Sequence, residues 1–152
     1  MNPTVRTCLW MERDAEQAAR FYVSLLPGST LDQVTRPRPN VAVVNFTLQG
    51  APYQILEAAP AQDKLNFAVS ISVATPDQAE TDRLWDALTQ GGTEIACSWL
   101  RDRYGLCWQI VPARFAELLA SPDKAAVERA MAAMETMKKL DLATLEKAFR
   151  GA

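Results

Sequence analysis

The sequence predicts an α+β fold made of two βαβββ modules and a helical C-terminal tail. Two amphipathic helices each follow one β-rich segment and precede three more, so the order of elements occurs twice. A faint internal repeat supports this order, because three residue pairs lie 63 positions apart at equivalent places on the two helices: Tyr22 and Trp85, Leu25 and Leu88, Gly28 and Gly91. From Pro112 onward the pattern is helical.

The first module is predicted to begin with a strand at 5–11 and a helix at 14–26. Asp14 is placed to cap this helix, and Gln17, three residues later, would complete a capping box. Pro27-Gly28 ends the helix. Its apolar residues recur at helical spacing: Ala15, Ala18, Ala19, Tyr22, Leu25 and Leu26.

Three strands should follow, and proline marks the loop between the first two. The segment Arg36-Pro37-Arg38-Pro39 is predicted to be this loop, since proline cannot donate to a strand ladder. A hairpin connection is expected at 49–52. The predicted strands are 30–36, 41–49 and 52–58.

The second module repeats the scheme, starting with a strand at 67–74. Thr75 is predicted to cap its helix, with Pro76 at the first helical position and Gln78 completing the box. Gly91-Gly92 ends this helix. The strands expected after it are 94–98, 99–102 and 105–111, with a turn at 102–105.

The tail should contain a helix starting at Ser121-Pro122-Asp123 and a short one capped by Asp141. Val127, Ala130, Met131, Met134 and Met137 follow one side of the longer helix, and such a methionine stripe is either core or a subunit contact. We expect a single domain over 1–152, with modules at about 4–60 and about 65–112 and the tail at 113–152.

Composition excludes several classes of function. The 152 residues carry a net charge of -2 with no basic patch, which argues against nucleic-acid binding. No apolar stretch approaches the ~20 residues of a membrane span, and no signal peptide is recognisable, so we expect a cytoplasmic protein. The chain has no histidine, which excludes a catalytic histidine and a His-ligated metal. Its three cysteines, Cys8, Cys97 and Cys107, are expected to be reduced, mostly buried side chains.

Four stretches resemble a known family: CLWMERDAEQAARFYVSLLPGS, DRLWDALTQGG, CSWLRDRYGLCWQIVP and MAAMETMKKLDLATLEKAF. They are similar to the PhnB-like branch of the vicinal oxygen chelate superfamily, the group of glyoxalases, bleomycin-resistance proteins and extradiol dioxygenases. The resemblance implies a curved eight-stranded sheet around a pocket, in a homodimer. This branch often carries a demethylubiquinone methyltransferase-like label, but the sequence lacks the Gly-rich turn of a Rossmann-like methyl-donor site.

The resemblance also implies where the metal ligands of the superfamily's enzymes would fall. These positions are Thr7, Glu57, Ala68 and Gln109, where the enzymes usually have two histidines and a glutamate among the four. Ala68 has no donor atom, Thr7 is a poor ligand, and Gln109 offers only a neutral carbonyl. We therefore expect no metal and no cofactor.

Strand alternation groups the residues expected to line the pocket. Thr7, Leu9 and Met11 share one face, as do Tyr53, Ile55 and Glu57. Ala68, Ser70 and Ser72 form a third set, and Cys107, Gln109 and Val111 a fourth. The pocket candidates are Thr7, Leu9, Tyr53, Glu57, Ser70, Trp99, Cys107 and Gln109.

Three of these candidates have a specific alternative interpretation. Glu57 is either in the pocket or at a solvated strand end, and Gln109 either contacts a ligand or satisfies a backbone group. Trp99 is either core or at the mouth of the pocket or a dimer seam.

Two functions remain open. The first is a binding protein for an unidentified planar or amphipathic small molecule, with the expected fold but no catalytic metal. The alternative is a metal-free enzyme in which Glu57 acts as general base. Neither involves nucleic acid or a membrane, and a homodimer is expected in both.

Overall fold

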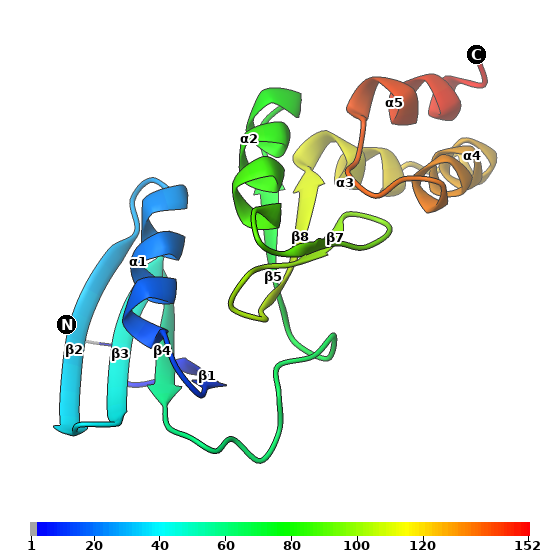
Figure 1. The fold of residues 1–152 in the computed structure, drawn as a ribbon. Coiled ribbons are helices and arrows are strands. Elements are labelled where there is room, and N and C mark those ends of the chain that lie inside the picture. Colours follow the sequence, from blue (N-terminus) through cyan, green and yellow to red (C-terminus); the bar gives the residue numbers. More distant parts are fainter. Residues whose placement is uncertain (1–2) are drawn as a thin grey trace. The chain divides into compact units, whose positions relative to one another are not determined.

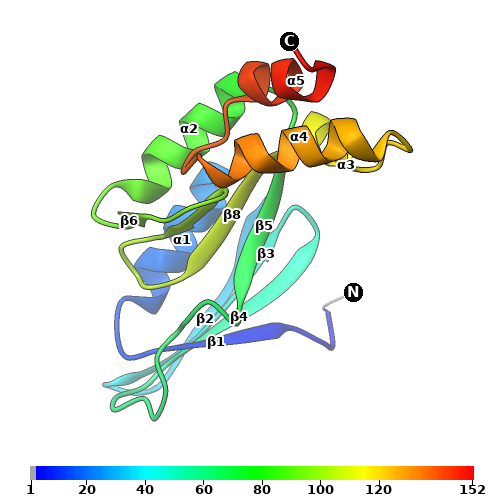
Figure 2. The same ribbon diagram turned by 90° about the vertical axis from the view of Figure 1, so that its right-hand side faces the viewer.

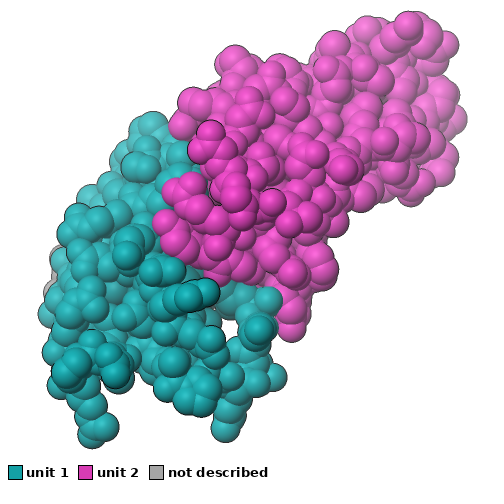
Figure 3. All heavy atoms as spheres, in the orientation of Figure 1, with its two compact units in different colours: residues 1–65 teal, residues 66–152 magenta. Residues whose placement is uncertain are grey.

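The computed structural model describes residues 3–152, which divide into two compact units at Leu65 and Asn66 (Figure 3). We refer to the part up to Leu65 as unit 1 and to Asn66–Ala152 as unit 2, and describe each by itself. Each unit contains one four-stranded sheet. The expected joining of the two sheets into one eight-stranded sheet, and the single domain, stay predictions.

Unit 1 is a βαβββ module (Figure 1). Its strands lie in the order β1-β4-β3-β2, with β1 parallel to β4 and the other neighbours antiparallel. This arrangement confirms the predicted first module. The elements are β1 (Thr7–Met11), α1 (Ala15–Leu25), β2 (Thr30–Arg38), β3 (Val41–Leu48) and β4 (Ala51–Glu57).

The core of unit 1 lies between α1 and one face of its sheet. Residues of β3 alternate strictly between buried and half-buried, which is the pattern of a strand with one face covered. The Tyr22 ring of α1 lies 6.3 Å from the Phe46 ring of β3, centroid to centroid. The buried side of the sheet is therefore the side that α1 covers.

Two local predictions in unit 1 were wrong. Asp14 precedes α1 with a left-handed φ of 64° and makes no side-chain cap, so the predicted capping box with Gln17 does not form. The strand β2 continues through Pro37 to Arg38, where a loop was expected. Its register against β3 shifts between Thr35 and Arg38, so the proline lies at an irregularity where it breaks no regular ladder.

Unit 2 repeats the same topology, with the strand order β5-β8-β7-β6 and a parallel β5–β8 pair. The internal repeat predicted from the sequence is confirmed, since Gly28 and Gly91 follow the two helices with positive φ values of 82° and 70°. The elements are β5 (Ser70–Thr75), α2 (Gln78–Thr89), β6 (Thr93–Glu94), β7 (Trp99–Arg101) and β8 (Cys107–Pro112).

The start of unit 2 differs from prediction in two places. β5 begins only at Ser70, because the Asn66 side chain accepts the Ala68 N–H at 2.8 Å and holds the preceding residues in a turn. The cap of α2 is Asp77, whose carboxylate accepts the Glu80 N–H at 2.8 Å. Thr75, the predicted cap, instead hydrogen-bonds Thr81.

The tail forms α3 (Ala113–Leu119), α4 (Lys124–Glu135) and α5 (Leu142–Arg150), and α3 continues directly from the end of β8 (Figure 2). The predicted cap Asp141 is confirmed, and Asp123 caps α4 at the start predicted for that helix; each accepts a backbone N–H three residues on. None of the helices in the described chain is long and apolar enough to cross a membrane. The core of the tail contains Phe115, Leu118, Ala130, Leu140 and Leu145, with Val111, Met131, Met134, Met137 and Phe149 packed against it.

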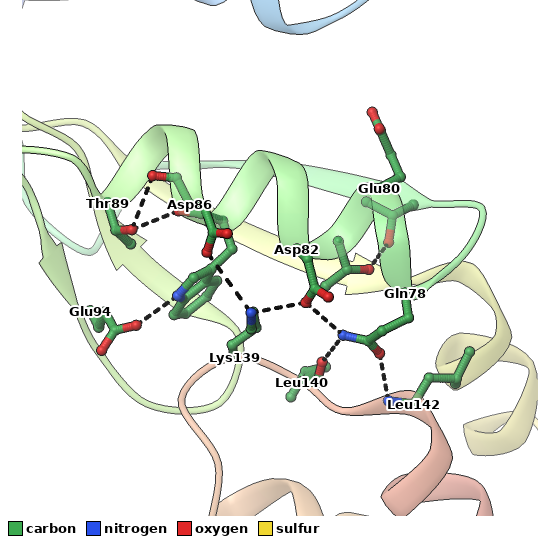
Figure 4. Close-up of polar contacts among 12 residues, drawn as sticks. Gln78, Glu80, Asp82, Asp86, Thr89, Glu94, Lys139, Leu140 and Leu142 are labelled. Atoms are coloured by element: carbon green, nitrogen blue, oxygen red, sulfur yellow. Dashed lines mark hydrogen bonds and ion pairs between the residues drawn. The ribbon is translucent and has the colours of Figure 1, made fainter.

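The segment between α4 and α5 is fixed to α2 by side chains (Figure 4). Gln78 uses both ends of its amide: Nε2 donates to the Leu140 carbonyl at 3.0 Å and Oε1 accepts the Leu142 N–H at 2.8 Å. Lys139 Nζ lies 2.9 Å from Asp82 Oδ1. The contact with Lys139, and after it the hydrogen bond from Gln78, lowers the pKa of Asp82 below its ordinary value. The contact with Asp82 raises the pKa of Lys139.

Candidate functional site

The strand register of unit 2 brings six side chains onto one face of its sheet. Paired residues share a face, so one row across the strands is Ser70–Cys107–Arg101 and the next is Ser72–Gln109–Trp99. We call these six residues the site face. Ile71, Trp108 and Leu100 occupy the opposite face, and they are buried on the side that also buries Leu84, Trp85 and Leu88 of α2.

The predicted candidates Ser70, Trp99, Cys107 and Gln109 all lie on the site face. Gln109 Nε2 donates to Ser70 Oγ at 2.9 Å, which links β8 to β5. Cys107 is fully buried, whereas Ser72 is exposed. Val111, next along this face of β8, packs against the core of the tail. The helical tail therefore bounds one end of the site face.

Phe67, from the turn before β5, reaches across to β7. Its ring makes an edge contact with Trp99 at 6.1 Å between centroids, and the Arg101 Cζ lies over it at 4.8 Å. Since β8 lies between β5 and β7 in the sheet, these contacts join the turn before β5 to a strand that is not its neighbour. Phe67 is 51% exposed and Val69 47% exposed, so an apolar surface borders the polar groups of the site face.

Neither Arg101 nor Phe67 was among the residues predicted from the sequence. Alternation along β7 could have placed Arg101 with Trp99, because residues two apart on a strand share a face. Phe67 could not have been found in this way, since it lies in a turn rather than in the strand expected there.

The unit 1 candidates lie on the face of the sheet that α1 covers. The β1–β4 register pairs Thr7 with Tyr53 and Leu9 with Ile55, so the predicted groupings by face are confirmed. Leu9 is 2% exposed and lies in the core, while Thr7 is exposed. Tyr53 stacks on Phe46 at 5.4 Å, and burial raises its pKa. Ligand binding at these positions stays a prediction.

Glu57 makes contacts typical of a helix cap. Its Oε2 accepts the N–H of Ala15, the first residue of α1, at 2.9 Å. Its Oε1 lies 3.9 Å from Arg36, and the side chain is only 17% exposed. Glu57 thus supplies the acceptor that Asp14 does not, at the positive end of the α1 dipole.

The other face of the unit 1 sheet carries Cys8 and Trp10, which flank Leu9 on β1 and therefore point away from it. Trp10 is 38% exposed, and its indole donates to the Ala58 carbonyl at 2.8 Å. On the same face Gln54 donates to Asn45 at 2.9 Å. The Trp10 indole is therefore engaged within unit 1, as is one hydrogen bond between the Gln54 and Asn45 amides.

A surface hollow of about 280 Å³ in unit 1 is lined by Glu16, Gln17, Arg20 and Arg36. Both of its arginines lie 2.8 Å from oxygens of Glu16. Each charged side chain that lines the hollow is therefore engaged in an ion pair.

The four positions that correspond to metal ligands do not fit a metal. Ala68 lies in the turn before β5 and has no donor atom. The Gln109 amide is hydrogen-bonded to Ser70, and Glu57 caps α1. Within residues 3–152, no group of three or more Cys, Asp or Glu side chains is arranged to hold a metal ion.

Comparison with known proteins places this fold in a family. The family model described as 3-demethylubiquinone-9 3-methyltransferase matches residues 3–111, which end just before the tail. The PhnB protein from Bacillus cereus has 26% identity, covers 73% of this chain and 100% of its own, and superposes with a TM-score of 0.67. No curated protein matches the chain.

More distant structures share the fold alone. A fosfomycin resistance protein from Mesorhizobium loti has 12% identity and a TM-score of 0.56, over 80% of this chain and 99% of its own. The glyoxalase I of Leishmania major has 12% identity and a TM-score of 0.55, over 88% of this chain and 100% of its own. The chain therefore belongs to the 3-demethylubiquinone-9 3-methyltransferase family, in its PhnB-like form, and has the paired-module fold of the glyoxalase and fosfomycin-resistance proteins.

Proposed function

We propose that this protein binds a small organic molecule on the site face of unit 2, without a catalytic metal. The observation that carries the proposal is the combination of the Gln109–Ser70 pair with the aromatic surface of Phe67 and Trp99. A few fixed polar groups beside apolar surface are the usual composition of a small-molecule site. The tail supports the proposal by bounding the face at Val111.

The absence of a metal follows from the chemistry of the residues at the ligand positions. A divalent cation needs several strong donors, and Ala68 supplies none. We also propose binding rather than methyl transfer. In each unit three of the four strands run in an antiparallel meander, which differs from the parallel doubly wound sheet of a Rossmann-type methyl-donor site.

Glu57 as a general base is the weaker reading. Both of its oxygens have partners within unit 1, and the shorter contact holds the start of α1. A base must reach a substrate proton by a hydrogen bond, which here would compete with the helix cap.

Native mass spectrometry of freshly purified protein tests this proposal. We expect a non-peptide mass on the wild-type chain that is lost on denaturation, and no stoichiometric metal by elemental analysis. Gln109→Leu should lose the added mass, whereas Gln90→Leu, at an exposed position after α2, should keep it. Metal at one equivalent per chain would contradict the metal-free reading, and equal retention by both variants would contradict the assigned face.

The same spectrum reports the number of subunits. We propose a homodimer, and a mass corresponding to a single chain at micromolar concentration would contradict it.

A further inference from the structure

We propose that Arg101 and Trp99 form an anion-binding site on the site face, which takes a small organic carboxylate with an aromatic or otherwise apolar body. This inference rests on the proposed function, because it names the chemical class of ligand for the same face. It depends on hydrogen-bond donors that the rest of unit 2 leaves unused.

Arg101 is the first of these donors. Its guanidinium makes no hydrogen bond or ion pair with another side chain in residues 3–152, and its Nε atom is buried without any partner there. Buried arginines are normally paired, because an unsatisfied charged donor is costly to remove from water. Arg101 as a whole is half-buried, so an acceptor brought by a ligand would pair with the guanidinium at its terminal N–H groups.

The indole N–H of Trp99 is the second donor. The other three tryptophans each donate to a protein oxygen, namely the Ala58 carbonyl, the Glu94 carboxylate and the Asp102 carboxylate. Trp99 donates to no acceptor in the described part of the chain. It lies two residues from Arg101 on the same face of β7, so the Cα atoms of the two residues are about 7 Å apart along the strand.

Within residues 3–152, no carboxylate forms an ion pair with Arg101. Asp102, the next residue, is 3% exposed and turned toward Trp108, on the α2 side of the sheet. Its oxygens also accept the N–H groups of Tyr104 and Leu106, at 2.8 and 3.1 Å. The charge of Asp102 is thus engaged in the turn before β8, and the positive charge of Arg101 remains on the site face.

The surroundings of Arg101 favour a carboxylate with an apolar body. Phe67 covers one side of the guanidinium, which leaves in-plane N–H groups as the route to an acceptor. A carboxylate matches this planar fork with two parallel hydrogen bonds. One guanidinium also balances the single charge of a carboxylate better than the double charge of a phosphate. The exposed ring of Phe67 offers the apolar body a surface to stack on.

The test is an NMR titration of the full chain with benzoate, with benzyl alcohol as the neutral probe of matched size and with inorganic phosphate. We expect benzoate to shift the Trp99 indole and Arg101 Nε–H signals saturably, and to bind at least about tenfold more tightly than the other two. Arg101→Gln should weaken benzoate binding by about tenfold or more, and Arg101→Lys should restore only part of it. Arg103→Gln, at an exposed turn position, should leave it unchanged.

Trp99→Phe keeps the ring and removes the indole donor, so it provides a second test if Arg101→Gln fails to fold. It should weaken benzoate binding several-fold without changing that of benzyl alcohol. Equal binding of benzoate and benzyl alcohol would overturn the anion site while leaving small-molecule binding intact. Phosphate binding as tightly as benzoate would overturn the carboxylate class. If no probe moved the Trp99 signal, both this inference and the proposed face would fail.

Discussion

Replacing Glu57 by alanine removes a helix cap that comes from 42 residues away in the chain. The Ala15 N–H, at the first position of α1, then loses its acceptor. Ala15 is fully buried, so water cannot easily replace the carboxylate. The helix would begin with an unsatisfied donor at its positive end.

The size of the effect follows from these contacts. A buried donor left without its acceptor costs about 1–3 kcal/mol, and loss of a cap costs about 0.5–2 kcal/mol; since both describe the same hydrogen bond, we expect about 1–2 kcal/mol in total. The 3.9 Å contact with Arg36 adds little, because Arg36 is 48% exposed. For a chain of this length, the thermal midpoint should fall by about 2–8 °C.

Thermal unfolding followed by circular dichroism measures this loss, with Glu128→Ala on the exposed side of α4 as control. Glu57→Gln keeps an acceptor oxygen and should recover most of the stability of the wild type. If Glu57→Ala unfolded within about 1 °C of both the wild type and Glu128→Ala, the capping role would be refuted.

Three further predictions concern unit 2. Gln78→Glu replaces the amide donor with a carboxylate that faces the Leu140 carbonyl, so it should lower the free energy of unfolding by about 1–3 kcal/mol in denaturant unfolding. The control Gln62→Glu, at an exposed position between β4 and β5, should change it by under about 0.5 kcal/mol. Cys97 has a φ of 56°, so Cys97→Val should destabilise the protein by about 1–2 kcal/mol more than Cys97→Gly does, and equal unfolding midpoints would contradict this. Since the folded pKa of Asp82 lies below its ordinary value of 3.8, its stabilising contribution is present above that pH and lost as pH falls through the folded pKa. The stability difference between the wild type and Asp82→Asn should therefore stay constant above about pH 5 and shrink as the pH falls below about 4, and a difference that stayed constant there would exclude the Lys139 contact as its cause.

The order of elements was predictable from the sequence because its signals are local. Helical spacing of apolar residues and the turn glycines Gly28 and Gly91 mark the two modules without reference to distant residues. The cap Asp141 was found for the same reason, since it bonds to a backbone N–H three residues on.

Two predicted helix caps were wrong. At α1 a residue distant in sequence supplies the cap, and α2 begins later than predicted. At α1 the acceptor is Glu57, which no local window could reveal. At α2 the predicted cap was Thr75, and the structure uses Asp77, two residues further on. Gln78 was predicted to complete the capping box with Thr75, but its side chain instead hydrogen-bonds the backbone of the tail at Leu140 and Leu142.

For the site, too, local pattern and tertiary packing each decided a different part. The sequence by itself determined which side chains share a face, because the period of a strand is two: Leu9 with Met11, and Gln109 with Cys107. It did not determine which face the helix covers, since β1 carries apolar residues, Leu9 and Trp10, on both faces. Only the tertiary structure put Leu9 beneath α1 and left Gln109 on the face opposite α2. It also brought Phe67 over Arg101, a contact between residues 34 positions apart that packing alone decides.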